Sequence, residues 1–70
     1  MERPQCLDGI RKILEDDSLT EDLAISPKTW DSIEIMSILA LIDRAGKEAS
    51  VADIHKCKSI KQLIDLACGL

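Results

Sequence analysis

The sequence has almost no aromatic side chains and few residues that favour turns. Its 70 residues include no Phe, no Tyr and one Trp, with three Gly and two Pro. Folds made of short strands need aromatic and β-branched residues within the strands and Gly or Pro between them. The composition therefore argues against an all-β fold. Seventy residues suffice for one domain and are too few for two.

Positive charge and long apolar runs are also scarce. Nine Lys and Arg face 13 Asp and Glu, which gives a net charge of −4, and this deficit of positive charge weighs against binding to nucleic acid. The longest apolar stretch, residues 33–42, has ten residues and contains Glu34 and Ser37. It is too short for a membrane span. The polar start of the chain shows no signal peptide.

The three cysteines are odd in number and lack the C-x-x-C spacing of redox and metal motifs. They are Cys6, Cys57 and Cys68. Small disulfide scaffolds use even and denser sets. We therefore expect three reduced thiols in a cytoplasmic protein, each filling a small apolar position.

Ten Ile and nine Leu, many of them at helical spacing, predict an all-α four-helix bundle with three longer helices and a short third one. The expected helices cover about residues 5–16, 32–45, 51–55 and 60–68. Gly46 and Gly69 are natural residues to end the second and the last helix.

The connection over residues 17–31 is longer than most loops of compact domains, and such loops tend to be functional. We expect a single turn at residues 20–23. Four apolar side chains are expected to attach the loop to the core, namely Leu19, Leu23, Ile25 and Trp30.

Several side chains that bind metals or phosphate in other proteins lack the necessary companions here. His55 and Cys57 have no second pair at the spacing of a zinc site, and the acidic residues of the long connection lack EF-hand spacing. Gly46 and Lys47 have no upstream Gly at P-loop spacing. We therefore expect no metal site, no catalytic residue and no enzymatic activity.

The Ser32 hydroxyl, in contrast, is well placed to carry an attached phosphate. Asp31, Ser32 and Ile33 put a serine in the first turn of the second helix, directly after the long connection. A phosphate attached to Ser32 would lie against free backbone N–H groups and the positive end of the helix dipole. The position suits a serine that carries a phosphodiester, but the same residues also suit a plain N-cap.

The order of these elements resembles the acyl carrier protein family, which includes peptidyl and aminoacyl carriers. The resemblance extends from the first helix to Leu66. It rests on three segments: Trp30-Asp31-Ser32-Ile33-Glu34, Val51-Ala52-Asp53-Ile54, and Ser59-Ile60-Lys61-Gln62-Leu63-Ile64-Asp65-Leu66.

The resemblance implies that Ser32 receives 4′-phosphopantetheine from coenzyme A through a separate Mg²⁺-dependent phosphopantetheinyl transferase. Asp31 matches the acidic residue that helps to position the metal and the transferase. Ile33 matches the aliphatic residue beside the root of the prosthetic group. The arm would hold an acyl or aminoacyl group as a thioester, so a loading ligase and downstream synthases or transferases are implied partners of a monomeric carrier.

The helix after the serine is the one that partner enzymes of this family read. Here it has less acid than in fatty-acid carriers, and Trp30 precedes the Asp-Ser pair where many of them have Gly or Ala. In both features the chain resembles small stand-alone carriers of specialised biosynthetic pathways. The dedicated partner of such a carrier would have a more apolar docking face. The candidate docking residues are Glu34, Ile35, Met36, Ser37 and Leu39.

The alternative hypothesis is a small helical protein–protein interaction module, such as a degenerate carrier. It would bind a partner through the same helix and hold no prosthetic group.

Overall fold

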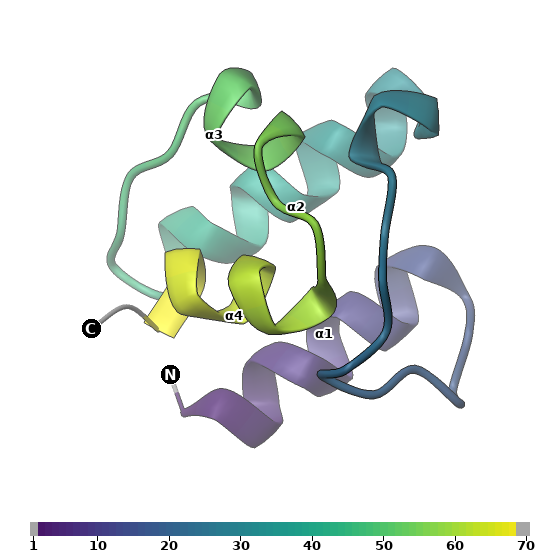
Figure 1. Ribbon diagram of the computed structural model, residues 1–70. Coiled ribbons are helices and arrows are strands. Elements are labelled where there is room, and N and C mark those ends of the chain that lie inside the picture. Colours follow the sequence, from purple (N-terminus) through teal and green to yellow (C-terminus); the bar gives the residue numbers. More distant parts are fainter. Residues whose placement is uncertain (1, 69–70) are drawn as a thin grey trace.

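The computed structural model describes residues 2–68 and is all-α, as predicted. Its elements are α1 (Arg3–Leu14), the 3₁₀ helix η1 (Pro27–Thr29), α2 (Ser32–Arg44), α3 (Val51–His55) and α4 (Ile60–Cys68) (Figure 1). No strand forms among the described residues; a single bridge pairs Ala24 with Ser59. None of the helices within residues 2–68 is long and apolar enough to cross a bilayer.

Helix α1 departs most from its predicted bounds, beginning and ending two residues early. It begins early because Pro4 fits a first helical turn and the side-chain carbonyl of Gln5 accepts the N–H of Glu2 at 2.9 Å. It ends early because Glu15 adopts a left-handed φ of 55° and the Asp16 N–H donates to the Arg11 carbonyl at 3.0 Å.

The other helices match the prediction to within one residue, because local caps define their ends. The hydroxyl of Ser50 accepts the N–H of Asp53 at 3.2 Å, and the Asp53 carboxylate accepts the N–H of Ser50 at 2.9 Å. Hydrogen bonds to the Asp53 carboxylate from the backbone N–H and the side chain of Ser50 lower the pKa of Asp53. Gly46, with a φ of 84°, follows α2 as expected. Gly69 lies outside the described residues.

The core consists of aliphatic side chains where α1, α2 and α4 pack together. Its fully buried members are mostly isoleucines, which fill the space that aromatic residues occupy in other small domains. The largest are Ile10, Ile38, Ile42, Ile54, Ile60, Leu63 and Ile64. Helix α3 packs at one end of this core, against α2 and η1.

Backbone hydrogen bonds attach the long connection to the beginning of α4. The N–H groups of Ile60 and Lys61 donate to the carbonyls of Leu23 and Glu21 at 3.0 and 2.9 Å, and the Ile25 N–H donates to Lys58 at 3.0 Å. The first amides of α4, which have no partner within the helix, are thereby satisfied.

Three of the four predicted apolar anchors of the connection pack on the core. Leu19 is buried, and Ile25 and Trp30 pack against the buried cluster. The prediction for Leu23 is wrong, because this residue is 43% exposed. Leu23 contacts α4 through its backbone carbonyl, which accepts the Ile60 N–H. The predicted turn at residues 20–23 is present, with the Leu23 N–H donating to Thr20 at 3.2 Å.

Arg3 joins α1 to both segments. Its guanidinium donates to Glu21 at 2.6 Å and to Asp65 at 2.7 Å. These hydrogen bonds raise the pKa of Arg3 above its usual value.

A disulfide joins Cys6 of α1 to Cys68 of α4. The prediction of three reduced thiols is therefore wrong for this pair, and only Cys57, which is buried, is a free thiol. Counting and local spacing fail here because the two cysteines are 62 positions apart and meet only when the start of α1 packs beside the end of α4 (Figure 1). Since disulfides persist mainly in oxidising compartments, the cysteines no longer support a cytoplasmic location.

Reduction of this disulfide should lower the free energy of unfolding by about 4 kcal/mol, because a cross-link over so long a segment removes much entropy from the unfolded chain. Urea unfolding followed by circular dichroism, with and without dithiothreitol, measures the change. The Cys6→Ala/Cys68→Ala double variant is the control and should not respond to the reductant. An equal response of both proteins, or none in either, would contradict this prediction.

Candidate functional site

A reciprocal pair of hydrogen bonds fixes the beginning of α2. The Asp31 carboxylate accepts the N–H of Glu34 at 2.7 Å, and the Glu34 carboxylate accepts the N–H of Asp31 at 3.2 Å. This capping box satisfies two of the amides that a helix start leaves open. The two carboxylates therefore determine where α2 begins and which residue is first in the helix.

The segment before α2 is anchored as well. Pro27 is buried and Trp30 packs against the core. The N–H of Trp30 donates to Pro27 at 3.1 Å, the Thr29 hydroxyl donates to Ser26 at 2.8 Å, and η1 packs against α3. The start of α2 is thus supported by η1, by α3 and by its own cap.

Ser32 is the first residue of α2, and its side chain is exposed. The N–H groups of Ser32 and Ile33 have no carbonyl one turn earlier in the helix, and they donate to no described residue. An oxyanion attached to the Ser32 hydroxyl would lie beside these donors and the positive end of the α2 dipole. Chemically, the position combines an accessible nucleophilic oxygen with an environment that favours an attached phosphate.

The exposed face of α2 next to Ser32 is apolar. Ile33 is 74% exposed and Met36 is 67% exposed, and residues three apart on a helix are neighbours. The exposed Ala40 continues this face, with the half-buried Ser37 beside it. Exposed apolar side chains that lie next to one another often mark a contact surface.

The structure does not bring all the predicted docking residues to this face. Ile35 is 6% exposed and belongs to the core, so its assignment to the docking face is corrected. Leu39 packs half-buried against the core, and the half-buried Glu34 takes part in the cap. The prediction missed Ala40, although its spacing of seven residues from Ile33 could have identified it.

Two of the side chains considered as metal ligands, those of Asp16 and Cys57, form local hydrogen bonds. Within the acidic connection, Asp16 accepts hydrogen bonds from the Ser18 hydroxyl and N–H, and these lower the pKa of Asp16. Burial raises the pKa of the Cys57 thiol, whose sulfur lies 3.5 Å from the Asp53 carbonyl. Residues 2–68 contain no group of three or more His, Cys, Asp or Glu side chains arranged to hold a metal ion.

Comparison of the chain with protein-family models, with curated proteins and with solved structures found no match. The assignment of a function therefore depends on the geometry at Ser32 and on the sequence pattern around it.

Asp31→Ala should lower the free energy of unfolding by about 1 kcal/mol, because it removes the acceptor for the Glu34 N–H. Asp31→Asn keeps an acceptor at the same place and should cost only a few tenths of that. Thermal unfolding of the three proteins in one buffer measures both effects. Equal destabilisation by Ala and Asn would show that the charge of Asp31, and not its cap hydrogen bond, stabilises α2.

Proposed function

We propose that this protein is an acyl or aminoacyl carrier, modified on Ser32 with 4′-phosphopantetheine. The observation that carries the proposal is the exposed Ser32 hydroxyl at the first position of an anchored helix, beside two unpaired backbone N–H groups. The resemblance of the chain to acyl carrier proteins, and the four helices of the structure, also support it.

The residues around Ser32 would each act on a different part of the attachment. The free amides of Ser32 and Ile33 would donate to the phosphodiester. Asp31 would contribute negative charge for the Mg²⁺ of the transferase, while its cap hydrogen bond keeps the hydroxyl at the helix start. The exposed Ile33 side chain would pack beside the root of the arm.

The bound arm would supply a terminal thiol that holds the cargo as a thioester. The protein itself would then position and present the cargo and leave the chemistry to other enzymes. Ile33, Met36 and Ala40 form an apolar face directly beyond the attachment point. We infer that loading and downstream enzymes dock there, and that they belong to a specialised biosynthetic pathway because this face lacks the acidic run of fatty-acid carriers.

Loading can be tested with the isolated protein. Incubation with coenzyme A and a broad-specificity phosphopantetheinyl transferase should increase the intact mass by one phosphopantetheinyl group. Ser32→Ala should abolish the gain, because the accepting oxygen is lost. The matched control is Ser26→Ala, which removes an exposed hydroxyl outside α2 that forms no side-chain cap hydrogen bond, and it should load normally.

A folded protein that gains no mass with several transferases would contradict the carrier proposal. The apolar face of α2 would then be better explained by an interaction module without a prosthetic group.

The role of Asp31 in loading can be separated from its role as a cap. Asp31→Asn keeps the cap acceptor but removes the charge, so its loading rate should fall sharply while the helical content stays unchanged. Time-resolved intact mass measurement of Asp31→Asn against the unaltered chain provides the test. A normal loading rate for Asp31→Asn would show that Asp31 acts only as a cap.

The aliphatic core offers a place for an acyl cargo. Ile38 of α2 and Leu63 of α4 are each 1% exposed and belong to the cluster that holds these helices together. Each methylene of a cargo that enters between them would contribute about 0.8 kcal/mol of hydrophobic free energy.

The methyl NMR shifts of Ile38 and Leu63 should therefore differ between the phosphopantetheinylated protein and its acylated form. Methyl spectra of the two forms, with an acetyl cargo as the short-chain control, measure this. Identical shifts with a long acyl chain would show that the cargo stays outside the core.

A further inference from the structure

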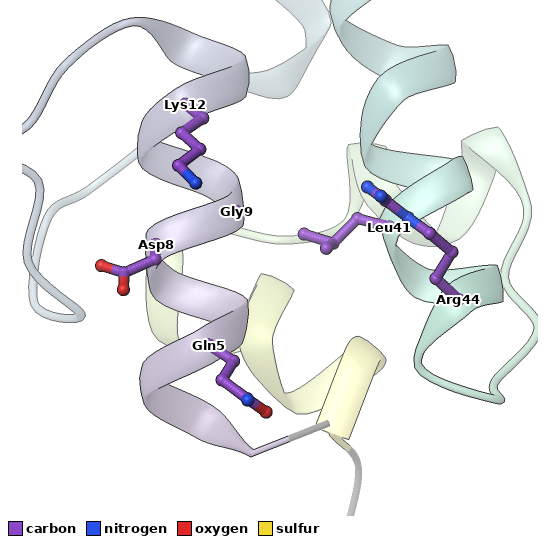
Figure 2. Close-up of a pocket in the computed structure, with 6 residues that line it drawn as sticks. All are labelled: Gln5, Asp8, Gly9, Lys12, Leu41 and Arg44. Atoms are coloured by element: carbon purple, nitrogen blue, oxygen red, sulfur yellow. The ribbon is translucent and has the colours of Figure 1, made fainter.

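A groove of about 520 Å³ separates α1 from α2 at the end of α2 that is remote from Ser32. Its lining residues are Gln5, Asp8, Gly9, Lys12, Leu41 and Arg44 (Figure 2). The volume lies within the range of small-molecule sites, about 300–1,000 Å³. Arg44 is twelve residues beyond Ser32, which corresponds to about 18 Å along a helix. The groove is therefore separate from the carrier site.

The charged groups of the groove favour an anion. Lys12 on α1 and Arg44 on α2 are both exposed, and neither forms an ion pair with a described residue. Asp8 is the one carboxylate of the lining; its side chain turns away from α2 (Figure 2), and Arg11 donates to it at 3.4 Å. Two cations from opposite walls thus lack a counterion, while the acid beside them has one.

Gln5 is the neutral polar residue of the lining. The side-chain carbonyl of Gln5 accepts the N–H of Glu2 at 2.9 Å. This leaves the NH₂ group of Gln5 available, which can donate but cannot accept. The lining therefore offers donors from an ammonium, a guanidinium and an amide.

The floor of the groove is apolar and closely fitted. Figure 2 shows Leu41 pointing from α2 toward Gly9 of α1. A Cβ atom at position 9 would lie 2.9 Å from Leu41 Cδ1, closer than such atoms approach in proteins. A glycine in the middle of a helix lowers its stability relative to alanine. Here it lets the two helices meet at the bottom of the groove.

We propose that this groove binds a small organic anion. An oxyanion head, either a carboxylate or a phosphate, binds between Lys12 and Arg44, and a short aliphatic body lies over Gly9 and Leu41. Charge-assisted hydrogen bonds from Lys and Arg hold such heads in other proteins. This site is independent of the proposed modification of Ser32, because all its residues lie on α1 and on the far end of α2.

Titration of the unmodified, ¹⁵N-labelled protein tests the site. The probes are hexanoate, butyl phosphate, acetate and inorganic phosphate, with hexanamide as the uncharged analogue of hexanoate. Hexanoate or butyl phosphate should shift the amide signals of Gly9, Lys12 and Arg44 saturably. Comparison of these two identifies the preferred head. Acetate should bind at least about tenfold more weakly than hexanoate, because it lacks four methylenes and burial of only two of them suffices for that difference.

Lys12→Gln and Arg44→Gln should each weaken binding about tenfold, because each removes a charge-assisted hydrogen bond. Lys28→Gln in η1 is the matched control: it makes the same change in net charge away from the groove and should bind normally. Asp8→Asn should tighten binding, since it removes the only negative charge of the lining. Both lining cations are exposed, so the fold should persist, and the amide spectra verify this.

Three results would overturn the proposal. They are the absence of saturable shifts with every anion, equal binding of hexanamide and hexanoate, and equal weakening by Lys28→Gln and Lys12→Gln. None depends on whether Ser32 can be loaded, so the failure of this site and the failure of the carrier proposal remain distinguishable.

Discussion

Burial of one face of α2 determines where the candidate functional residues lie. Ile35, Ile38 and Ile42 are at most 6% exposed, and together they fix the rotation of the helix against α1 and α4. Because a helix turns about 100° per residue, Ile33 and Met36 must then face solvent. The exposed apolar face is therefore a geometric consequence of how the aliphatic core is filled.

The same packing separates two regions with different properties. At the beginning of α2, free backbone amides and the helix dipole favour an attached phosphate at Ser32. At its end, Lys12 and Arg44 border a groove that favours a dissociable anion. The elements around α2 are attached to one another by the Cys6–Cys68 disulfide and by backbone hydrogen bonds between the long connection and α4. Both regions are consequently held on a small but cross-connected frame.

The sequence predicts best what is decided by neighbours in the chain. The beginnings of α3 and α4 follow from Ser50 and Ser59, whose hydroxyls accept the N–H groups of residues three positions later. The start of α2 follows from Asp31 in the same way. The left-handed turn at Glu15 ends α1 early. The sequence did not predict this end, because position 15 is not the glycine that usually marks such a turn.

Features that join residues far apart in the chain could not be predicted from local sequence patterns. Prediction of the Cys6–Cys68 disulfide would require knowing that the first and last helices lie side by side. The groove combines residues of α1 and α2 that no local motif connects. The assignment of Ile35 to the docking face failed for another reason: apolar content was considered without the helical period that separates Ile35 from Ile33 and Met36.

The carrier proposal requires that Ser32 carries a prosthetic group when the protein performs its function. The most direct measurement is the intact mass of the protein purified from the cells that make it naturally, followed by peptide mapping. The carrier proposal predicts a chain that carries one phosphopantetheinyl group on the peptide containing Ser32. A chain that is unmodified at Ser32, in cells whose other carriers are loaded, would contradict it.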